Sequence, residues 1–368
     1  MMSKRFKRRG LGLLAAMVVV SLLVGFNFCQ AADAPKGKQL KWALFFAEAT
    51  YQAPSVKKLR DDIEAYTNGE VKPKLYWVGQ IAETKDLPDL VRTGAVDMIT
   101  TSPNYHQAIY PLNAALQAFP VLLSSTAQGA YVWLNLFQNL PEVQGEFAKN
   151  NEYCLNRVSL STFITASSKP LRTVADWKGL KVRAFPGKYT SDWMKALGAS
   201  NIDMPMADIY EALMRKVMDA TATNVQFMES LKFYEVAKYV TFPFGNIVGW
   251  QTSMNVKVWN SLSPEAKKGI TRAAMEFGAR DLELNLSSEK KSADSLKQKG
   301  VTFITPDPKE MKAFFDKAGD PWAASKDFLV NNKVDAGVAD EFLKRWRELA
   351  AEYDKKYAST GKKWEYGK

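Results

Sequence analysis

Between residues 176 and 224 the hydrophobic positions change period several times, and each change predicts an element. After a turn signal at Lys178-Gly179, the segment 180–185 predicts a short strand, which the following Pro-Gly pair ends. Apolar residues then recur on one face of a helix over 189–197, with Gly198 at its C-cap. The next predicted elements are a strand over 202–204, a helix over 207–216 and a strand over 217–221. This β-α-β-α-β order predicts parallel strands with a ligand beyond their carboxyl ends.

The same order of periods occurs earlier in the chain. It predicts strands over 41–46, 71–78 and 95–100, separated by helices over 55–66 (with Ser55 as a candidate N-cap) and 87–92. The segment LVRTGAVDMITTSPN in this half also parallels LMRKVMDATATN in the other. We interpret the likeness as a structural pseudo-repeat that forms two α/β lobes facing each other. A chance likeness between two helix-to-strand junctions is the alternative.

Two lobes with a cleft between them suit hinge closure around a small ligand. We expect the chain to cross between lobes near residues 159–161 and to return near 250–253. After the return, Ser263-Pro264-Glu265 has the residue types of a helix start, and the helical pattern continues to about Lys297. The remaining predicted elements are a strand over 301–304 and helices over 311–330 and 338–357, followed by a basic tail over 359–368.

The first 31 residues have the pattern of a secretory signal. Five basic residues precede an apolar stretch over 11–28, and Cys29-Gln30-Ala31 supplies small residues at positions −3 and −1 of a cleavage site after Ala31. An uncleaved anchor is the main alternative, because about 18 apolar residues is the lower limit of a membrane span. A lipoprotein signal is disfavoured by the bulky residues before Cys29, and a twin-arginine signal fits only loosely. We predict export to the periplasm.

Charge and cysteine content narrow the function classes. Cleavage after Ala31 removes five positive charges, which lowers the formal net charge from +11 to about +6. The remaining basic residues form no dense block, so nucleic acid is not an expected partner. Cys154 is the one cysteine left, so an intramolecular disulfide is excluded, and its apolar neighbours suggest a buried side chain.

The chain offers little material for catalysis. His106 is the one histidine, and it lies in a polar loop context (SPNYHQAIYP) where we expect a partly exposed side chain. The sequence contains no nucleophile-elbow motif, no CxxC or HExxH and no phosphate loop. We therefore predict no enzyme activity, no cofactor and no metal site.

Five phrases in order resemble the solute-binding proteins of TRAP transporters, the DctP-like family. They are LKWALFF, GQIAETKDLPDLVRTGAVDM, DWKGLKVRAF, PMADIYEALMRKVMDA and LKFYEVAKYVT. The resemblance covers essentially the whole mature chain. It implies a two-lobed periplasmic-binding-protein-like (type II) α/β fold, in which each lobe is a mixed β-sheet flanked by helices and a long helix spans both lobes. We assign 38–160 plus about 250–290 to lobe I, and 161–249 plus about 291–368 to lobe II.

The resemblance implies that the protein captures a small organic acid by cleft closure and delivers it to a membrane permease, for uptake driven by an ion gradient. We expect a monomer or a weak dimer. A receptor that reports the same ligand to a membrane sensor is the alternative. An exported hydrolase is a further alternative, and it would require turnover that depends on His106 or an acid pair.

Arg183 is the main candidate for ligand binding. It lies at the end of the first strand of lobe II, and a guanidinium can give a carboxylate two parallel charge-assisted hydrogen bonds. Other candidates lie at or beyond predicted strand ends. From lobe I they are Phe46, Glu48, Tyr51, Gln80, Ser102, Asn104 and Tyr105, and from lobe II they are Met206, Asn224, Gln226, Asn246 and Trp250. Trp177 and Trp193 are predicted to lie in the core.

The sequence departs from the family pattern at one point. Many family members carry another arginine early in lobe II, where this chain has Thr162 or Phe163 in STFITASSKPL. With one arginine rather than two, a dicarboxylate is disfavoured. Trp250, Phe163 and Met206 instead suggest a monocarboxylate with an apolar body.

Overall fold

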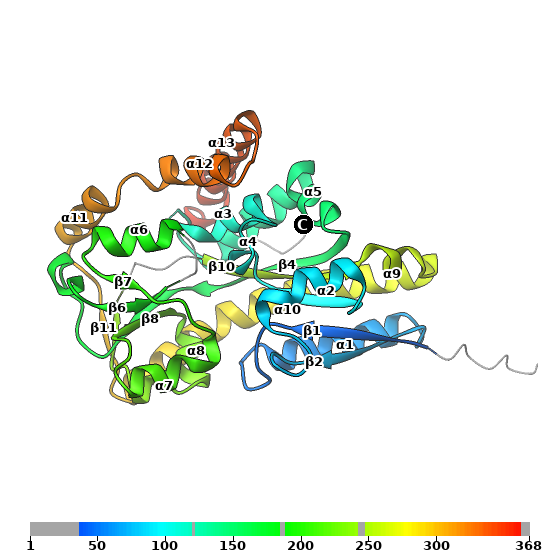
Figure 1. Cartoon of the computed structure of the whole chain (residues 1–368), viewed down its shortest axis with the longest axis horizontal. Coiled ribbons are helices and arrows are strands. Elements are labelled where there is room, and N and C mark those ends of the chain that lie inside the picture. The colour runs from blue at the N-terminus through cyan, green and yellow to red at the C-terminus, as the bar shows by residue number, and fades with distance from the viewer. Residues whose placement is uncertain (1–36, 120–121, 185–187, 242–246, 362–368) are drawn as a thin grey trace, which may run out of the picture. The chain divides into compact units, whose positions relative to one another are not determined.

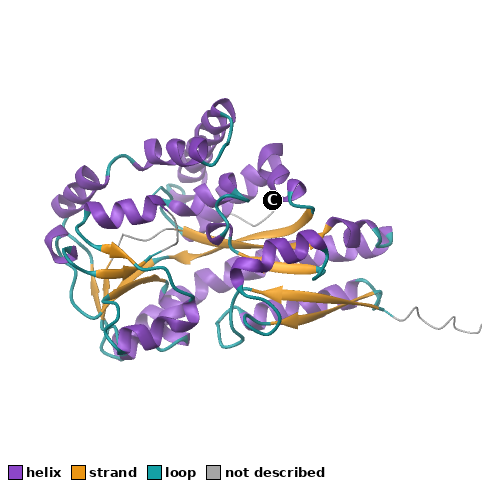
Figure 2. Cartoon of the chain, viewed as in Figure 1, coloured by secondary structure: helices purple, strands orange, loops and turns teal. Residues whose placement is uncertain are grey.

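The computed structural model describes residues 37–119, 122–184, 188–241 and 247–361. The compact unit begins at Lys38. The predicted signal sequence, the Pro186-Gly187 turn and the last seven residues of the predicted tail lie outside the described residues. The described strands form a five-stranded sheet and a six-stranded sheet (Figures 1 and 2).

The first module of the fold has the predicted β-α-β-α-β order. Its elements are β1 (Lys38–Leu44), α1 (Ala53–Tyr66), β2 (Val71–Tyr76), α2 (Leu87–Thr93) and β3 (Met98–Thr101). Both β2 and β3 pair with β1 in parallel, so β1 is the middle strand. The predicted cap at Ser55 is wrong, because α1 begins at Ala53 with Gln52 at the N-cap. Pro54 stands in the first turn, where its missing N–H leaves no helical hydrogen bond unmade.

The second module repeats this arrangement. Its elements are β6 (Lys181–Arg183), α6 (Lys188–Ala196), β7 (Ser200–Asn201), α7 (Ile209–Met214) and β8 (Ala220–Thr223). Here β7 and β8 both pair with β6 in parallel, so the order β7-β6-β8 corresponds to β2-β1-β3. The parallel strands of both modules are confirmed. Gly198 has a φ of 78°, the left-handed conformation expected of a helix C-cap.

Two boundaries in the second module differ from the prediction. The predicted strand over 202–204 forms two residues earlier, at β7, and the predicted strand over 217–221 forms later, at β8. In both places the predicted bounds included apolar residues that do not lie in the strand. Met204 instead lies in the loop after β7, and the side chain of Val217 is exposed.

Antiparallel strands extend both parallel modules. In the first sheet β10 (Ile247–Asn255) pairs with β3 and with β4 (Glu152–Thr162). In the second sheet β5 (Ile164–Ser167) pairs with β8 and with β9 (Tyr239–Thr241), and β9 pairs with β11 (Thr302–Ile304). The chain therefore crosses from one sheet to the other at Phe163, just after the predicted hinge. The predicted return near 250–253 is wrong, because these residues lie inside β10 with partners on both sides.

The long helix α10 (Pro264–Gln298) contacts elements of both sheets. Ser263 caps it by accepting a hydrogen bond from the Ala266 backbone N–H, as the sequence predicts. The helix packs on α1, on β4 and on α8 (Val225–Ser230). Its apolar residues join two separate cores: Phe277 lies with the β1 and β10 core, whereas Leu296 lies with the α7 and α8 core. This bridging helix fits the predicted fold class.

Five further helices contribute to a third core. It contains α3 (Pro111–Ala118), α4 (Thr126–Asn139), α12 (Pro321–Asn331) and α13 (Ala336–Tyr353), with α5 (Pro141–Lys149) at its edge. The predicted single helix over 311–330 is wrong. The chain forms α11 (Pro308–Ala318) and then α12, because Gly319 has a φ of 86° and Pro321 begins a new helix. Helices α12 and α13 contact α3 and α4.

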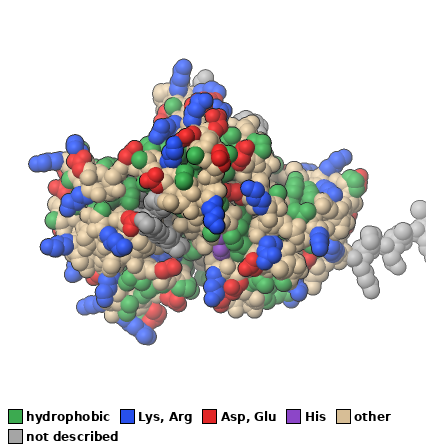
Figure 3. All heavy atoms as spheres, turned by 45° about the horizontal axis from the view of Figure 1, so that its top comes forward, with side chains coloured by type: hydrophobic (Ala, Val, Ile, Leu, Met, Phe, Trp, Pro, Cys, Tyr) green, Lys and Arg blue, Asp and Glu red, His purple; other side chains and the backbone are tan. Residues whose placement is uncertain are grey.

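Lys and Arg side chains are interspersed with Asp and Glu on the face shown in Figure 3. Among the described residues, no helix is both long enough and apolar enough to cross a membrane.

Candidate functional site

A cavity of about 470 Å³ is lined by residues from both β-α-β-α-β modules. The first module contributes residues 45–47, which directly follow β1, together with Thr50, Val78, residues 83–85 and Tyr105. The loop between β7 and α7 contributes residues 203–207, and Leu231 follows α8. These segments follow the carboxyl ends of β1, β2, β3 and β7, which is where the parallel topology predicts a ligand. The cavity size falls in the usual range of small-molecule sites.

Arg183 lies beneath this cavity, at the last residue of β6. Its side chain is 1% exposed. The guanidinium Nε donates to the Met204 carbonyl at 3.2 Å, and Nη2 donates to the Tyr105 hydroxyl at 3.2 Å. Met204 and Tyr105 both line the cavity, whereas Arg183 does not. The positive charge is therefore separated from the cavity by the residues that accept its hydrogen bonds. The prediction that Arg183 ends the first strand of the second module is confirmed.

Tyr105 connects the two modules at this point. It ends the 3-10 turn Pro103–Tyr105, which follows β3, while its hydroxyl accepts the hydrogen bond from Arg183 of β6. Its ring is 6.0 Å from that of Phe45, another cavity residue. Among the described contacts, the hydroxyl accepts from Arg183 and donates to no protein group. Its proton is therefore available to an acceptor in the cavity.

Aromatic residues support the cavity wall on the first-module side. Phe46 is 5% exposed, and its ring contacts Trp77 and Trp250 with centroid distances of 5.9 Å and 5.3 Å. Trp250 is 1% exposed and packs against Phe277 of α10. This candidate therefore lies in the core behind the cavity wall and supports Phe45 and Phe46 from below.

A buried hydrogen-bond network links the two modules through α10. The Asn285 Oδ1 accepts from the Tyr51 hydroxyl at 2.7 Å, and that hydroxyl accepts from Asn224 at 3.3 Å. The backbone carbonyl of Asn285 accepts from Ser161 at the end of β4 and from Gln226 of α8. The network thus joins α10 to both sheets close to the crossover at Phe163. Asn224, predicted as a ligand residue, also caps α8 by accepting from the Phe227 N–H at 2.7 Å.

Three further predicted site residues, all within the described part of the chain, lie outside the cavity. Glu48 is exposed and forms an ion pair with Lys57. The Gln80 Oε1 accepts from the Trp77 N–H at 3.0 Å and so stabilises the turn after β2. Asn104 is buried beside Tyr105 and accepts from Gln107. Asn246 lies outside the described residues.

The single histidine is buried, and Cys154 is partly buried. His106 is 7% exposed and shares a hydrogen bond of 2.9 Å with Thr101, so the expected partial exposure is wrong. Burial lowers the pKa of His106 to about 4, and burial raises the pKa of the Cys154 thiol to about 12. Neither residue lines the cavity. Among the described residues, no group of three or more His, Cys, Asp or Glu side chains is placed to hold a metal ion.

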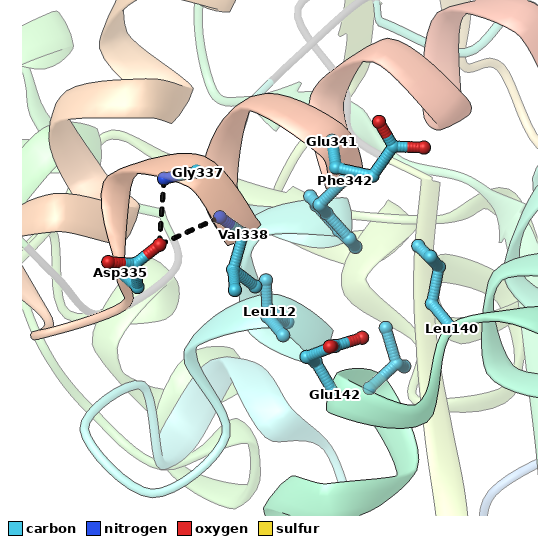
Figure 4. Close-up of a pocket in the computed structure, with 9 residues that line it drawn as sticks. Leu112, Leu140, Glu142, Asp335, Gly337, Val338, Glu341 and Phe342 are labelled. Carbon is cyan, nitrogen blue, oxygen red and sulfur yellow. Dashed lines mark hydrogen bonds between the residues drawn. The ribbon is translucent and has the colours of Figure 1, made fainter.

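A second cavity, of about 320 Å³, lies between α3, α5 and α13 (Figure 4). Its charged lining residues are Glu142, Asp335 and Glu341, and Asp335 accepts hydrogen bonds from the first backbone N–H groups of α13. An anionic ligand in this cavity would meet three like charges. The cavity beside Arg183 is therefore the better site for an acid.

Several cavity residues were not predicted. Phe45, Met204, Pro205, Ala207 and Leu231 are apolar and adjoin predicted strands or helices, where such residues ordinarily signal core. The polar residues Glu83 and Lys85 lie in the phrase GQIAETKD after the second strand, so position could have indicated them. Phe46, Tyr105 and Met206 are the predicted residues that line the cavity. The topology of strand ends thus predicted the place of this cavity better than the residue types predicted its lining.

Comparison with known proteins identifies a family. The sequence profile of the family described as bacterial extracellular solute-binding protein, family 7 (DctP), matches residues 43–327. The chain is 26% identical over 291 residues to the 2,3-diketo-L-gulonate-binding periplasmic protein YiaO of Escherichia coli, which covers 77% of this chain and 85% of that protein. It is 25% identical over 315 residues to the C4-dicarboxylate-binding periplasmic protein DctP of Rhodobacter capsulatus, covering 80% and 86%.

Solved structures confirm the fold class. A TRAP periplasmic solute-binding protein of Desulfovibrio salexigens with bound orotic acid superposes with a TM-score of 0.74 at 20% identity, covering 85% of this chain and 99% of that one. A marine metagenome TRAP solute-binding protein with co-purified pyroglutamate gives a TM-score of 0.75 at 17% identity, covering 85% and 99%.

Proposed function

The chain belongs to the bacterial extracellular solute-binding proteins of family 7, the DctP family, and from this premise we propose that it captures a small organic acid by closing two lobes around it. The proposal keeps the two lobes of the sequence analysis but divides them at Phe163 and between β9 and β10, not near 250–253. Export by a signal peptide cleaved near Ala31 would place the protein in the periplasm. Relatives described as binding 2,3-diketo-L-gulonate, C4-dicarboxylates and sialic acid support an acid as ligand.

One observation carries the proposal: the buried Arg183 guanidinium lies under a cavity to which both modules contribute, and a hydroxyl from the other module contacts it. A carboxylate that displaces or accepts from the Tyr105 hydroxyl would meet a full positive charge in a poorly solvated place, where charge-assisted hydrogen bonds are strongest. Because Arg183 and Tyr105 come from different modules, such a ligand would also hold the modules together.

The proposal includes delivery to a membrane permease pair, as the family implies. Uptake into vesicles that contain the cognate permease, dependent on this protein and on an ion gradient, would test the delivery step. Uptake that proceeds equally without the protein would contradict it.

Calorimetric titration with carboxylates and their neutral amides tests the capture step. We expect the mature protein to bind a carboxylate and to discriminate against the matching amide by about 100-fold or more, because the amide cannot pair with a buried guanidinium. Arg183→Met should abolish this discrimination, whereas Arg215→Met should keep it, since Arg215 is exposed on the far end of α7 and pairs with Glu211. Equal affinity of the wild-type protein for acid and amide would refute capture by charge.

A further inference from the structure

The residues that line the cavity indicate what the rest of the ligand is like, beyond its acid group. Nine of the fifteen described lining residues are apolar. Phe45 and Phe46 come from the first module, and Met204, Pro205 and Met206 come from the second. Thioether and aromatic side chains offer a polarisable surface that favours planar or aliphatic groups.

Uncharged hydrogen-bonding side chains are few among the described lining residues. The side-chain hydroxyls belong to Thr50, Thr84 and Tyr105. The Thr50 hydroxyl already donates to the Ala47 carbonyl at 3.0 Å, and the Tyr105 hydroxyl accepts from Arg183. A polyhydroxylated ligand would bury several hydroxyls against carbon, and each buried polar group without a partner is costly.

The charged residues around the cavity favour a ligand with a single negative charge. Glu83, Lys85 and Asp203 are the charged residues among the described lining, and all three are exposed. Arg183 beneath the wall is buried. With Arg183 counted, these four residues sum to zero, and the exposed ones are screened by solvent. A second carboxylate on the ligand would be repelled by Glu83 and Asp203. Among the described lining residues, Lys85 is the one cation that could pair with it.

We propose that the ligand is a monocarboxylate with an apolar, ring-sized body. Its carboxylate accepts from the Tyr105 hydroxyl and the Arg183 guanidinium, and its body packs between the phenylalanines after β1 and the 204–206 loop. This inference rests on the proposed capture of an acid, and it adds the class of acid. It excludes dicarboxylates and sugar acids as the best ligands, although some relatives are named for them.

Titration of the mature protein with four probes tests the inference: phenylacetate, succinate, D-glucuronate and the neutral 2-phenylethanol. We expect phenylacetate to bind at least about tenfold more tightly than each of the other three, which is the effect of a few buried carbon groups or one charge contact. Met206→Gln keeps the side-chain length and adds an amide. It should weaken phenylacetate about fivefold and leave succinate within about twofold. Met275→Gln, at an exposed position on α10, is the matched control and should change neither.

The outcomes separate this inference from the proposed function. If succinate or D-glucuronate binds most tightly and Arg183→Met abolishes that binding, the apolar class is wrong and capture of an acid stands. If 2-phenylethanol binds as tightly as phenylacetate, or if Arg183→Met leaves acid binding unchanged, both are wrong. Weakening of all three acids by Met206→Gln in equal measure would also overturn the apolar class.

Discussion

The two β-α-β-α-β modules share a topology but place different chemistry at the same point. In each, the first strand lies in the middle of three parallel strands; residues after β1 line the cavity, and Arg183 at the end of β6 contacts two of its lining residues. Directly after β1 stand Phe45 and Phe46, whereas β6 ends in Arg183. At the end of its middle strand, the first module therefore places apolar side chains, whereas the second places a positive charge. The topology determines where a ligand can sit, and one or two residues at the strand end determine what it can be.

The modules also differ in how they are anchored. The strands β1 and β2 have seven and six residues, and they share a large core with α1, β10 and α10. The strands β6 and β7 have three and two residues, and their smaller core includes Phe314 of α11. Arg183 therefore lies in the module with the shorter strands and the smaller core. We expect changes there to affect binding more than folding, and changes under the first module to affect folding more.

Removing the charge of the second module should have the largest effect. Arg183→Met deletes the guanidinium while keeping a side chain of similar length, so the modules would both present apolar strand ends. We expect ligand affinity to fall by about 2–5 kcal/mol, because a buried charge contact is lost. Calorimetry measures the affinity, and circular dichroism checks the fold. A fall in ligand affinity of less than tenfold would mean that the Arg183 charge does not contribute to binding.

Adding a methyl group where α10 packs closely on α1 of the first module should have the next largest effect, which is on stability. A Cβ on Gly269 of α10 would lie 2.3 Å from the Tyr66 carbonyl oxygen at the end of α1. Gly269→Ala should therefore destabilise the protein by about 1–3 kcal/mol, despite the better helix propensity of alanine. Thermal unfolding of the two proteins measures this difference.

Gly145→Ala is the matched control, because Gly145 also lies inside a helix, α5, and a Cβ there meets nothing within 4 Å. This variant should gain up to about 1 kcal/mol. Equal melting temperatures for the two variants would contradict the tight seating of α1 on α10.

The pH dependence of stability tests the helix that joins the modules. Asp281 of α10 is fully buried, and burial raises the pKa of its carboxyl from an ordinary value near 4 to about 7. It accepts a hydrogen bond from Asn285, and the Asp281 and Glu289 carboxyls both act electrostatically on the Tyr51 hydroxyl, which donates to Asn285. Because the pKa is raised in the folded state, this group stabilises the fold fully below about pH 4, and the contribution is lost as pH rises to about 7.

Asp281→Asn removes that titration. Between about pH 5 and about pH 8, the melting temperature of this variant should fall by a few degrees less than that of the wild type. Asp316→Asn, at an exposed residue of α11, should follow the wild type. If the Asp281 variant also follows the wild type, the buried carboxyl does not titrate in this range.

Removing the hydroxyl that joins the modules should have the smallest effect. Tyr105→Phe keeps the ring against Phe45 but deletes the acceptor of the Arg183 hydrogen bond. We expect a loss of about 0.5–1.5 kcal/mol in affinity for a carboxylate, the usual net value of one hydrogen bond. Titration of a carboxylate and its amide measures it. An equal loss for both ligands would show that the hydroxyl does not contact the acid group.

Much of the fold was predictable because it depends on periodicity. The parallel modules, the long capped helix and the position of Arg183 at a strand end all follow from local patterns. Trp177 and Trp193 are buried as predicted. The errors arise where non-local contacts decide the outcome. His106 is polar in a loop context but is buried against Thr101, and Trp250 resembles a hinge residue in sequence but lies in the core between β10 and α10.

The composition of the site was harder to predict. Gln80 and Glu48 lie in the expected loops, but their side chains serve local contacts with Trp77 and Lys57. Phe45 lies beside the predicted Phe46 and lines the cavity as well. In a strand, alternate residues point to opposite faces, but beyond the last pair of β1 that alternation no longer applies. Which polar residue faces the ligand depends on loop geometry, which the sequence pattern does not specify.

The most direct test is a crystal structure of the mature protein with its tightest ligand bound. The carboxylate should lie about 3 Å from the Arg183 guanidinium or the Tyr105 hydroxyl, and the apolar body should contact Phe45 and Met206. A ligand whose acid group lies at Lys85 or in the cavity between α3, α5 and α13, with Arg183 still covered, would contradict the account.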